Sequence, residues 1–590
     1  MKPKEGRKLH QLQQRLRSDS FVLYKRVMTE LFRHHEDHDF VHRLSTYFRS
    51  SRYDKALEFA ELLSEQTYSD ATTHFVAAQF AQLIRKYPWD PKVVKTDPEA
   101  KAIRKFLSSE HKCTWLNRKF FLYDSFRSPH EELLSRMRNF IRYVIGEEPP
   151  MDMIYSNCAF GAGASLGVHG DATNLLRKLS VGKFSVTPGA FTHSLVAMWH
   201  NPHLRDILSE ERNGFTCLDF EDATKRLQNR VTYVNHNKIS FVPKTAITHR
   251  AIAVEPLLNG FLQKGIDTTL RLFLKRVGID LGNQSVNQHL ARSGSFDDCG
   301  DSTFVTIDLS SASDSISIGL VKSLIPPGWY DLLYATRSPS YLLDGKVYPY
   351  SKFCSMGNGF CFPLETLIFA ACCYAVGAGK AGTDFSVYGD DIILQRAYAD
   401  DALKLLRVLG FSPNANKTFI TGPFRESCGA DWFGGIDVRP YILDYSLDSL
   451  ENLFKWLNLT RRNELTTLFF AGTEDIILSS IPESYQFWRP VKGNPDSGID
   501  TFGSEHLTSR NCFFERRSMT WICKVLLTKP KPDKGFGLQT YRRNSVDMYA
   551  LLSGVSSRHY EVGYSFRRKT KTTVSLARYG EAISNWLPYS

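Results

Sequence analysis

The octapeptide VYGDDIIL, at residues 387–394, places a glycine and two adjacent aspartates inside a run of apolar and β-branched residues. The flanking residues predict two short strands, joined across Gly389 and Asp390 in a tight hairpin. Two ionised carboxylates this close repel each other, and partial burial adds to the cost. Either the pair lies in a solvated turn, or a cation lies between the two side chains. Taken alone, the Gly-Asp-Asp triplet favours the ordinary turn.

A strand that ends in a third aspartate is predicted upstream of this hairpin. Residues 303–307, TFVTI, alternate in β-favouring types, and Asp308 should close the strand. Small residues then turn the chain, and Ser313 or Asp314 is expected to cap a helix that runs toward Leu324. If this strand pairs beside the hairpin, the three aspartates meet at one end of the sheet.

Asp308, Asp390 and Asp391 would then form a cluster that cannot stay ionised without cations. Oxygen-only ligands favour a hard cation, Mg²⁺ or Mn²⁺. Two such ions about 3.5–4 Å apart make the clamp used in phosphoryl transfer. One ion would lower the pKa of an attacking hydroxyl, and the other would stabilise a leaving pyrophosphate.

Other polar segments surround the two acidic stretches. Between them, SKFCSMGNGFCFPLETL at residues 351–367 predicts a bend in which backbone groups and an amide face outward, at the start of a buried helix; its residues are Ser355, Gly357, Asn358 and Gly359. The apolar run at 364–378 contains Glu365 near its start and is too short to cross a bilayer. No membrane span is expected.

Basic residues complete this part of the chain. Residues 403–419 predict a helix that runs into a loop carrying Lys417, and residues 422–435 predict a turn and a short hairpin. Upstream, residues 238–256 predict a strand-like segment bracketed by Lys244, His249 and Arg250. These three basic residues would suit a triphosphate.

Composition limits the class of protein. A chain of 590 residues exceeds the size of a single core, so several subdomains are expected. The 74 Lys and Arg against 62 Asp and Glu give a net charge of +12, which favours a polyanionic partner such as nucleic acid over a merely basic protein. The eleven cysteines form no CxxC pair and no apolar stretch follows the basic N-terminus, which predicts reduced core thiols, no zinc and no secretory signal.

The remaining segments carry weaker signals. The first ~150 residues read as largely helical, and the glycine-rich residues 157–170 predict a flexible loop that lacks the complete phosphate-loop and dinucleotide motifs. Residues 526–537, LLTKPKPDKGFG, predict a linker. Residues 556–573 interleave Lys and Arg with Tyr and Phe, which suits either a surface for single-stranded nucleic acid or a solvated basic tail.

In this order, the segments resemble the motifs of template-directed RNA polymerases with a palm domain. The resemblance is closest to the replicase catalytic subunit of positive-strand RNA bacteriophages, the Qβ and MS2 group of leviviruses. It is carried, over roughly residues 240–430, by the strings RAIAVEP, GIDLGNQSVNQ, DLSSASDSIS, PPGW, SMGNG, VYGDDIIL, KTF and GPFRESCG.

The resemblance implies a role for each matching residue. Asp308, Asp390 and Asp391 would bind two catalytic Mg²⁺ ions, with Mn²⁺ or Ca²⁺ as substitutes in binding, and Lys417 would protonate the leaving pyrophosphate. The incoming nucleotide would meet residues that line its entry or recognise its ribose, namely Lys244, Arg250, Asp314, Ser355, Gly357 and Asn358. The hairpin at 425–429 would lie against the priming RNA strand, through Arg425, Glu426 and Ser427.

Two positions depart from the family's pattern. Many RNA polymerases place four residues between the two aspartates of the first acidic motif, whereas five separate Asp308 from Asp314, so Ser313 is a rival for sensing the ribose. Phage relatives also carry a second lysine where this chain has Ile247, and His249 would compensate only in part.

Two other functions are open. A reverse transcriptase shares the palm and the paired aspartates, but it usually carries a bulky aromatic residue after the first catalytic Asp, where this chain has only small residues. An RNA-binding protein with an inactive polymerase fold is the second alternative, although all three metal carboxylates are present.

The sequence and the resemblance together predict an α+β fold with a right-hand architecture. Fingers with some palm elements would occupy residues 1–300, the catalytic palm core 300–430, and the thumb and C-terminal region 431–590. The chain would copy a positive-strand RNA genome from NTPs in the cytoplasm of a bacterial host. Its relatives imply elongation factors Tu and Ts and an RNA-binding ribosomal protein as partners, and no membrane.

Overall fold

The computed structural model describes residues 3–122, 130–169, 175–179, 181–208, 210–212, 215–217, 219–296, 300–491, 494–501, 512–532 and 566–579. Helices and strands are mixed throughout this part of the chain, which confirms the α+β prediction at the level of secondary structure. The first 150 residues are mainly helical, as predicted: α1 (Pro3–His34), α2 (Asp39–Arg49), α3 (Tyr53–Leu63), α4 (Ala71–Arg85), α5 (Pro98–Leu122) and α7 (Glu131–Ile145).

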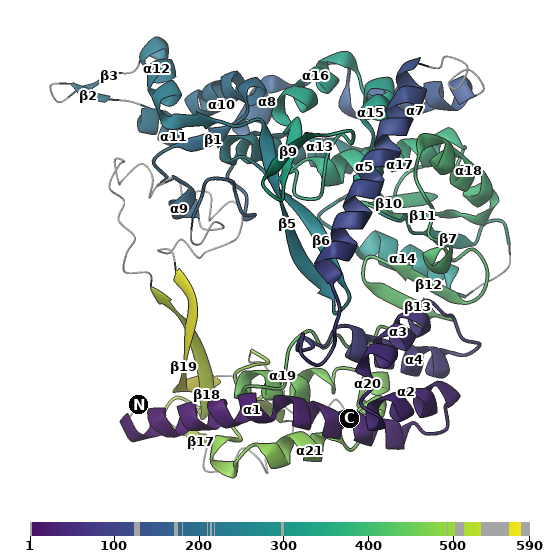
Figure 1. Ribbon diagram of the computed structural model, residues 1–590, viewed down its shortest axis with the longest axis vertical. Helices are drawn as coiled ribbons and strands as arrows, with labels where there is room; N and C mark the ends of the chain where they lie inside the picture. Colours follow the sequence, from purple (N-terminus) through teal and green to yellow (C-terminus); the bar gives the residue numbers. More distant parts are fainter. Residues whose placement is uncertain are drawn as a thin grey trace.

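A three-stranded antiparallel sheet lies at the centre of the largest core. Its strands are β7 (Phe304–Ile307), β10 (Phe385–Tyr388) and β11 (Asp391–Gln395), in the order β10-β11-β7. Their alternate apolar side chains pack on the buried helix α17 (Cys361–Ala375), and α18 (Ala399–Leu409) packs on that helix in turn. The predicted strand and hairpin are both confirmed (Figure 1).

A second sheet lies beside this core, with the order β6-β5-β8-β9. It is formed by β5 (His236–Thr245), β6 (Thr248–Val254), β8 (Ser340–Leu343) and β9 (Lys346–Pro349). The long β5–β6 hairpin turns at Ala246, whose N–H donates to the carbonyl of Arg85 at 2.9 Å. Helix α5 packs against β6 and against α15 (Ile318–Leu324), so it lies along the outside of both sheets' cores.

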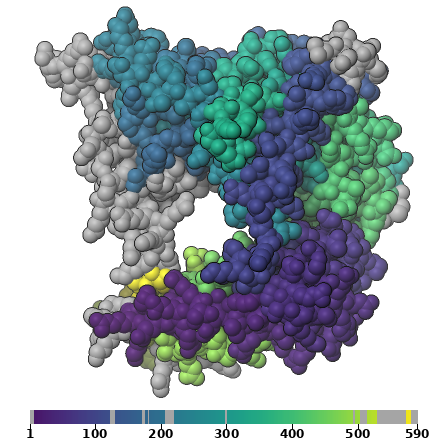
Figure 2. Space-filling model, in the orientation of Figure 1, coloured from purple at the N-terminus to yellow at the C-terminus, as the bar shows by residue number. Residues whose placement is uncertain are grey.

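The N-terminal helices share a hydrophobic core with the later part of the chain. Residues between Leu9 and Val94 pack with residues between Phe424 and Leu526, including the helices α19 (Leu450–Leu459), α20 (Glu464–Phe469) and α21 (Thr473–Ser480). Figure 1 shows α1 lying beside α21. The first helices of the chain therefore pack on segments from residue 424 onward. In the space-filling view an opening lies above α1 and beside the start of α5 (Figure 2).

Short elements complete the fold between residues 151 and 336. A separate core is formed mainly by α8 (Met151–Ser156), β1 (Phe184–Val186), α10 (Pro188–His200), α11 (Pro202–Leu208), α12 (Phe220–Arg230), β4 (Val231–Tyr233) and α13 (Leu257–Arg276). Also present are α9 (Leu175–Leu179), β2 (Glu210–Arg212), β3 (Phe215–Cys217), α14 (Ser285–Gly294) and α16 (Pro327–Thr336). The glycine-rich residues 157–169 form neither helix nor strand, as predicted.

Sheet structure replaces part of the predicted C-terminal linker and tail. The remaining strands are β12 (Phe424–Ser427), β13 (Ala430–Phe433), β14 (Ile436–Asp437), β15 (Trp488–Pro490), β16 (Ile499–Thr501), β17 (Cys512–Glu515), β18 (Thr520–Pro532) and β19 (Phe566–Tyr579). The linker prediction at 526–537 is wrong up to Pro532, because these residues pair with β19. Residues 566–573 of the predicted basic tail belong to β19, and residues 556–565 lie outside the described residues.

Two further predictions, on the cysteines and on membrane spans, can be compared with the structure. The nine cysteines whose side chains are described are buried and carry free thiols, in agreement with the predicted reduced state. None of the described helices combines the length and the apolarity needed to span a membrane.

Candidate active site

The strand register brings the three aspartates to one end of the central sheet. Strand β7 runs antiparallel to β11 with Ile307 opposite Ile392, so the next position along the register sets Asp308 beside Asp391. Asp390 lies in the two-residue turn between β10 and β11. Gly389 opens this turn at φ 65°, and a Cβ there would lie 2.3 Å from the Phe362 ring. Glycine is therefore required where the chain turns to present the carboxylates.

The electrostatics of these carboxylates indicate mutual repulsion. Burial, together with the charges of Asp390, Glu426 and Asp308, raises the pKa of Asp391 to about 7. Burial also raises the pKa of Asp308, against the opposing effects of Lys417 and of a hydrogen bond from Asn414. A bound cation would remove this penalty, because it favours the ionised form of each carboxyl group.

Hydrogen bonds hold the carboxylates of Asp308 and Asp391 in place. The Asn414 side-chain amide donates to Asp308 Oδ2 at 2.9 Å, and its backbone N–H donates to the Asp308 carbonyl at the same distance. The Cys428 thiol lies 3.7 Å from Asp391 Oδ2. Each carboxylate thus keeps oxygen lone pairs free of these contacts.

A hard divalent cation fits the chemistry of this donor set. All the donors are carboxylate oxygens, the ligands that Mg²⁺ prefers, and Lys417 is the cation whose charge acts on Asp308. Among the described residues, no group of three or more His, Cys, Asp or Glu side chains is already arranged as a metal cage. The aspartates adjoin one another without converging on a single point.

Lys417 lies at the edge of this cluster. Its Nζ donates to both carboxylate oxygens of Glu426, at 3.2 and 3.3 Å. Burial lowers its pKa, but the charges of Glu426 and Asp308 outweigh that effect and leave the pKa raised. The lysine is therefore a protonated group beside the aspartates, as a proton donor at this position must be.

Asp314 is held by a buried lysine instead of capping a helix. Lys352 is fully buried, and its Nζ lies 2.8 Å from Asp314 Oδ1 and 3.6 Å from Glu110 Oε1. The cap prediction is wrong, because Ser317 fills that position and accepts the N–H of Leu320. Residues 313–315 form a 3₁₀ turn before it.

Ser313, the rival for the ribose, is engaged elsewhere. Its hydroxyl donates to Glu365 Oε2 at 2.7 Å. Burial, together with the charges of Asp390 and Asp314, raises the pKa of Glu365 to about 8. Glu365 is a charged residue at the start of an otherwise apolar helix. A lone carboxylate in an apolar run was therefore the feature of the sequence that could have identified Glu365 as a neighbour of the site. Lys352 and Asn414 gave no such signal.

The SMGNG loop packs inward against β6, which corrects the predicted outward-facing amide. Ser355 and Asn358 are buried, and the Asn358 side-chain oxygen accepts the N–H of Phe360 at 3.1 Å. Gly357 has φ 114°, and a Cβ there would lie 2.2 Å from the carbonyl oxygen of Ala253. The loop is shaped by its contact with the β5–β6 hairpin.

A cationic cluster stands at the other end of that hairpin. Lys244 is exposed, yet crowding of its ammonium group by surrounding protein lowers its pKa, and the charges of Arg250, Lys417 and Lys105 lower it further. Lys86 donates to the Lys244 carbonyl at 2.7 Å. Clustered cations of this kind attract polyanions. Ile247 packs at the edge of the joint N- and C-terminal core. The His249 Nδ1 is buried and has no hydrogen-bond partner among the described residues.

The hairpin predicted to contact RNA is present as β12 and β13, but two of its residues face inward. Arg425 is fully buried, and its guanidinium donates to the carbonyls of Phe304, Gly422 and Phe424. Ser427 is also buried and accepts from Asn287 at 3.3 Å. Direct RNA contact by these two side chains is therefore not supported. Glu426 is partly exposed on the same strand.

Comparison with known proteins identifies the family. A family model described as RNA replicase, beta-chain matches residues 45–585. The RNA-directed RNA polymerase subunit beta of Enterobacteria phage SP is 38% identical over 388 residues, which cover 64% of this chain and 62% of the relative. The subunit of the same name from Escherichia virus Qbeta is 34% identical over 393 residues, with the same two coverages.

A third relative gives the same result. The RNA-directed RNA polymerase beta chain of Escherichia phage MS2 is 37% identical over 385 residues, which cover 61% of this chain and 66% of the relative. The chain spans less than two thirds of the length of the relatives from phage SP and virus Qbeta. The family resemblance seen in the motifs is confirmed, because the family model extends over most of the residues: the chain belongs to the RNA replicase beta-chain family.

Proposed function

We propose that this chain is an RNA-directed RNA polymerase that replicates a positive-strand RNA genome. The observation that carries the proposal is the meeting of Asp308, Asp390 and Asp391 at the end of the β7–β11 pair, with Lys417 beside them. The reaction would be attack of an RNA 3′-hydroxyl on the α-phosphate of an incoming NTP, templated by RNA. Positioning and charge neutralisation would supply most of the catalysis.

The three aspartates would hold divalent cations, Mg²⁺ with Mn²⁺ or Ca²⁺ as substitutes in binding, which would activate the 3′-hydroxyl and offset the charge of the leaving pyrophosphate. Lys417 would hold a proton at Nζ for that pyrophosphate. Lys244 and Arg250 would bind the triphosphate, since both belong to the cationic cluster. Glu426 would lie against the priming strand.

Recognition of the ribose would involve Asp314 together with the SMGNG loop. The ion pair with Lys352 keeps Asp314 an acceptor for a 2′-hydroxyl. Gly357 holds the loop on β6, and Ser355 and Asn358 shape it from within. We therefore assign Asp314 the direct role, because Ser313 already donates to Glu365.

The right-hand architecture and the biological setting belong to the same proposal. The central sheet would be the palm, the β5–β6 hairpin would be part of the fingers, and the segment after residue 431 would contribute the thumb. The chain would act in the cytoplasm of a bacterial host, with elongation factors Tu and Ts and an RNA-binding ribosomal protein as partners. These partners rest on the family resemblance alone.

The proposal is tested by the exchange Asp390→Asn, assayed as primer-independent NTP incorporation on added RNA. We expect incorporation to fall by at least ~1000-fold with an unchanged melting temperature, since the turn is kept and one ligand charge is lost. Asp400→Asn, an exposed carboxylate on α18, is the matched control and should retain full activity.

Two alternatives are separated in the same assay. Preference for dNTPs over NTPs on an RNA template would identify a reverse transcriptase. Absence of incorporation by the unaltered chain, with RNA binding intact, would identify an inactive RNA-binding relative. Unchanged incorporation by Asp390→Asn would refute the site assignment.

A further inference from the structure

The solvent face of helix α5 carries cations at helical spacing. Positions separated by alternating steps of four and three residues lie on one face of a helix, and on α5 these positions are Lys101, Lys105, Ser108, Lys112, Trp115 and Lys119. None of them is acidic. Glu110, on another face, is buried and accepts the backbone N–H of Ser351. The stripe formed by these six residues rises about 27 Å along the helix at ~1.5 Å per residue.

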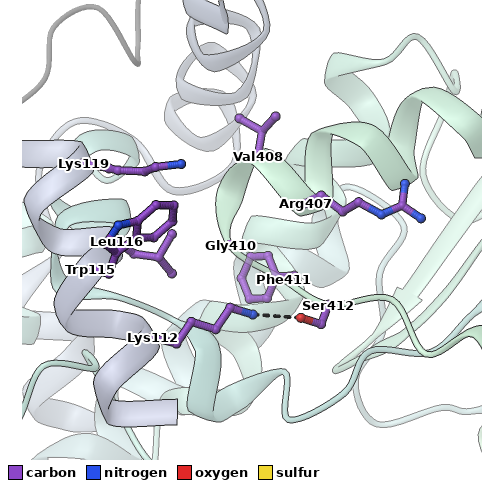
Figure 3. A pocket seen from close by; sticks show the side chains of 9 residues that line it. All are labelled: Lys112, Trp115, Leu116, Lys119, Arg407, Val408, Gly410, Phe411 and Ser412. Atoms are coloured by element: carbon purple, nitrogen blue, oxygen red, sulfur yellow. Dashed lines mark hydrogen bonds between the residues drawn. The ribbon is translucent and has the colours of Figure 1, made fainter. Parts of the chain in front are cut away.

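The stripe passes a pocket between α5 and the end of α18 (Figure 3). The cavity has a volume of about 470 Å³ and is lined by Lys112, Trp115, Leu116, Lys119, Arg407, Val408, Gly410, Phe411 and Ser412. Leu116 and Phe411 are buried and form an apolar floor. Trp115 is 54% exposed at the wall, so part of its ring is open to a ligand.

The charge of the pocket is entirely positive. Its lining contains three cations and no carboxylate. Lys112 donates to the Ser412 hydroxyl at 2.8 Å. Burial lowers the pKa of Lys112, because it disfavours the charged ammonium group, and a bound anion would offset that effect. Neither Lys112 nor Arg407 forms an ion pair with any carboxylate in the described part of the chain. Lys119 Nζ lies 3.8 Å from the Trp115 ring centroid, which shows that this ring accepts a charged partner on its face.

Both ends of the stripe lie near the candidate active site. At the pocket, the carbonyl of Ser412 accepts the N–H of Ser310, two residues after Asp308. At the other end, the charge of Lys105 acts on Lys244 in the cationic cluster. The start of α5 also borders the opening seen in Figure 2.

We propose that this face of α5 binds single-stranded RNA outside the catalytic carboxylates, with one nucleotide seated in the pocket. Its base would stack on Trp115, and its phosphate would lie between Lys112 and Arg407. Phosphates farther along the strand would follow Lys105 and Lys101. Stacking platforms next to a line of cations are what single-stranded nucleic acids bind without regard to sequence. A free nucleotide offers the same base and phosphate chemistry, but it would use only one end of a ~27 Å stripe.

The test uses the full chain with Asp390→Asn, so that no incorporation occurs, and a short RNA oligonucleotide carrying 4-thiouridine. After irradiation and digestion, we expect the peptide that contains Trp115 to carry the cross-link. Unlabelled RNA should suppress that cross-link at concentrations at which NTPs do not. Trp115→Ala should reduce its yield at least fivefold.

Charge variants give an independent measurement. Exchange of both Lys112→Gln and Arg407→Gln should weaken oligonucleotide binding about tenfold. It should reduce the slope of log affinity against log salt by about 0.7, the value for the one phosphate that both side chains contact. Tyr143→Ala, which removes an aromatic ring 78% exposed on α7, and Lys404→Gln, which removes an exposed charge from α18, are the matched controls. Both should leave cross-linking and affinity unchanged.

Three results would overturn the proposal. They are a cross-link pattern that omits residues 101–119, equal binding by the pocket variants and the controls, and suppression of the cross-link by NTPs as effectively as by RNA. The last result would assign the pocket to a free nucleotide. Because cross-linking needs no turnover, failure of the proposed polymerase activity would leave this result unaffected.

Discussion

Lys352 illustrates how a single residue decides the state of its neighbours. Its ammonium group is fully buried, with two carboxylates on one side and the Phe106 ring centroid 3.5 Å away on the other. Burial raises the pKa of Glu110, and the charge of Lys352 opposes that effect. Removing one partner of a buried ion pair costs more than the pair contributes, because the other charges are left uncompensated.

We therefore expect Lys352→Met to destabilise the protein by about 3 kcal/mol, a typical cost for such a deletion. The measurement is the urea midpoint of unfolding. In active preparations, discrimination against dNTPs should also weaken, since Asp314 would lose the group that orients it. Lys404→Met, at an exposed position on α18, should change the free energy of unfolding by less than about 0.5 kcal/mol. A midpoint for Lys352→Met equal to that of the control would contradict the prediction.

At the scale of elements, the sequence predicted those strands and hairpins that are determined by contacts between residues close together in the chain. The strands β7, β10 and β11 and the hairpin β12–β13 were predictable, because their alternation and their turn residues act within a few positions. The sequence predicts Ser313 or Asp314 as the helix cap, because several small polar residues compete in DLSSASDSIS and only tertiary contacts select Ser317. Residues 526–532 of β18 are predicted as part of a linker, because their partner strand β19 lies more than thirty residues farther along the chain.

The SMGNG loop gives the sharpest prediction for an element. Gly357→Ala should displace the loop from β6, because the new Cβ would meet the Ala253 carbonyl and the backbone conformation is unfavourable for alanine. We expect a loss of at least ~2 kcal/mol and a higher KM for NTPs. Gly345→Ala is the matched control: its φ is 77° but a Cβ there meets nothing within 4 Å, so it should cost only about 1 kcal/mol. Equal effects of the two exchanges would show that the close contact is unimportant.

For the whole molecule, the joint core of the first and later segments is the main result that sequence reasoning missed. Gln79 on α4 exchanges two hydrogen bonds with the backbone of Tyr441, at 2.7 and 2.8 Å, and Gln13 donates to Glu451. Contacts between residues more than 300 positions apart leave no periodicity or spacing in the sequence. Two histidines lie within this core, His35 stacked on Phe469 and His74 beside Phe424.

These histidines should make the joint core sensitive to acid. Burial lowers the pKa of both His35 and His74 to about 4, against 6.5 in an unfolded chain. The folded state therefore favours the neutral ring, and the unfolded state takes up protons first as the pH falls. Stability should be fully present above pH 6.5 and decline between pH 6.5 and about 4, by up to ~3 kcal/mol for His74.

The measurement is the melting temperature as a function of pH. His74→Gln should flatten the profile between pH 6.5 and 4, whereas His42→Gln, at an exposed position on α2, should leave it unchanged. A profile of His74→Gln that matches that of the unaltered chain would show that this ring does not couple the core to pH.

The shared core also has a consequence for the order in which the protein can form during synthesis. Val94 and Phe424, members of the same core, are separated by 330 positions. At ~5–20 residues per second, a ribosome needs tens of seconds to extend the chain from one to the other. During that interval the apolar faces of α1–α4 have emerged without the segments that cover them. Helices α1–α4 can therefore bury their apolar faces only after the segments from residue 424 onward have been synthesised.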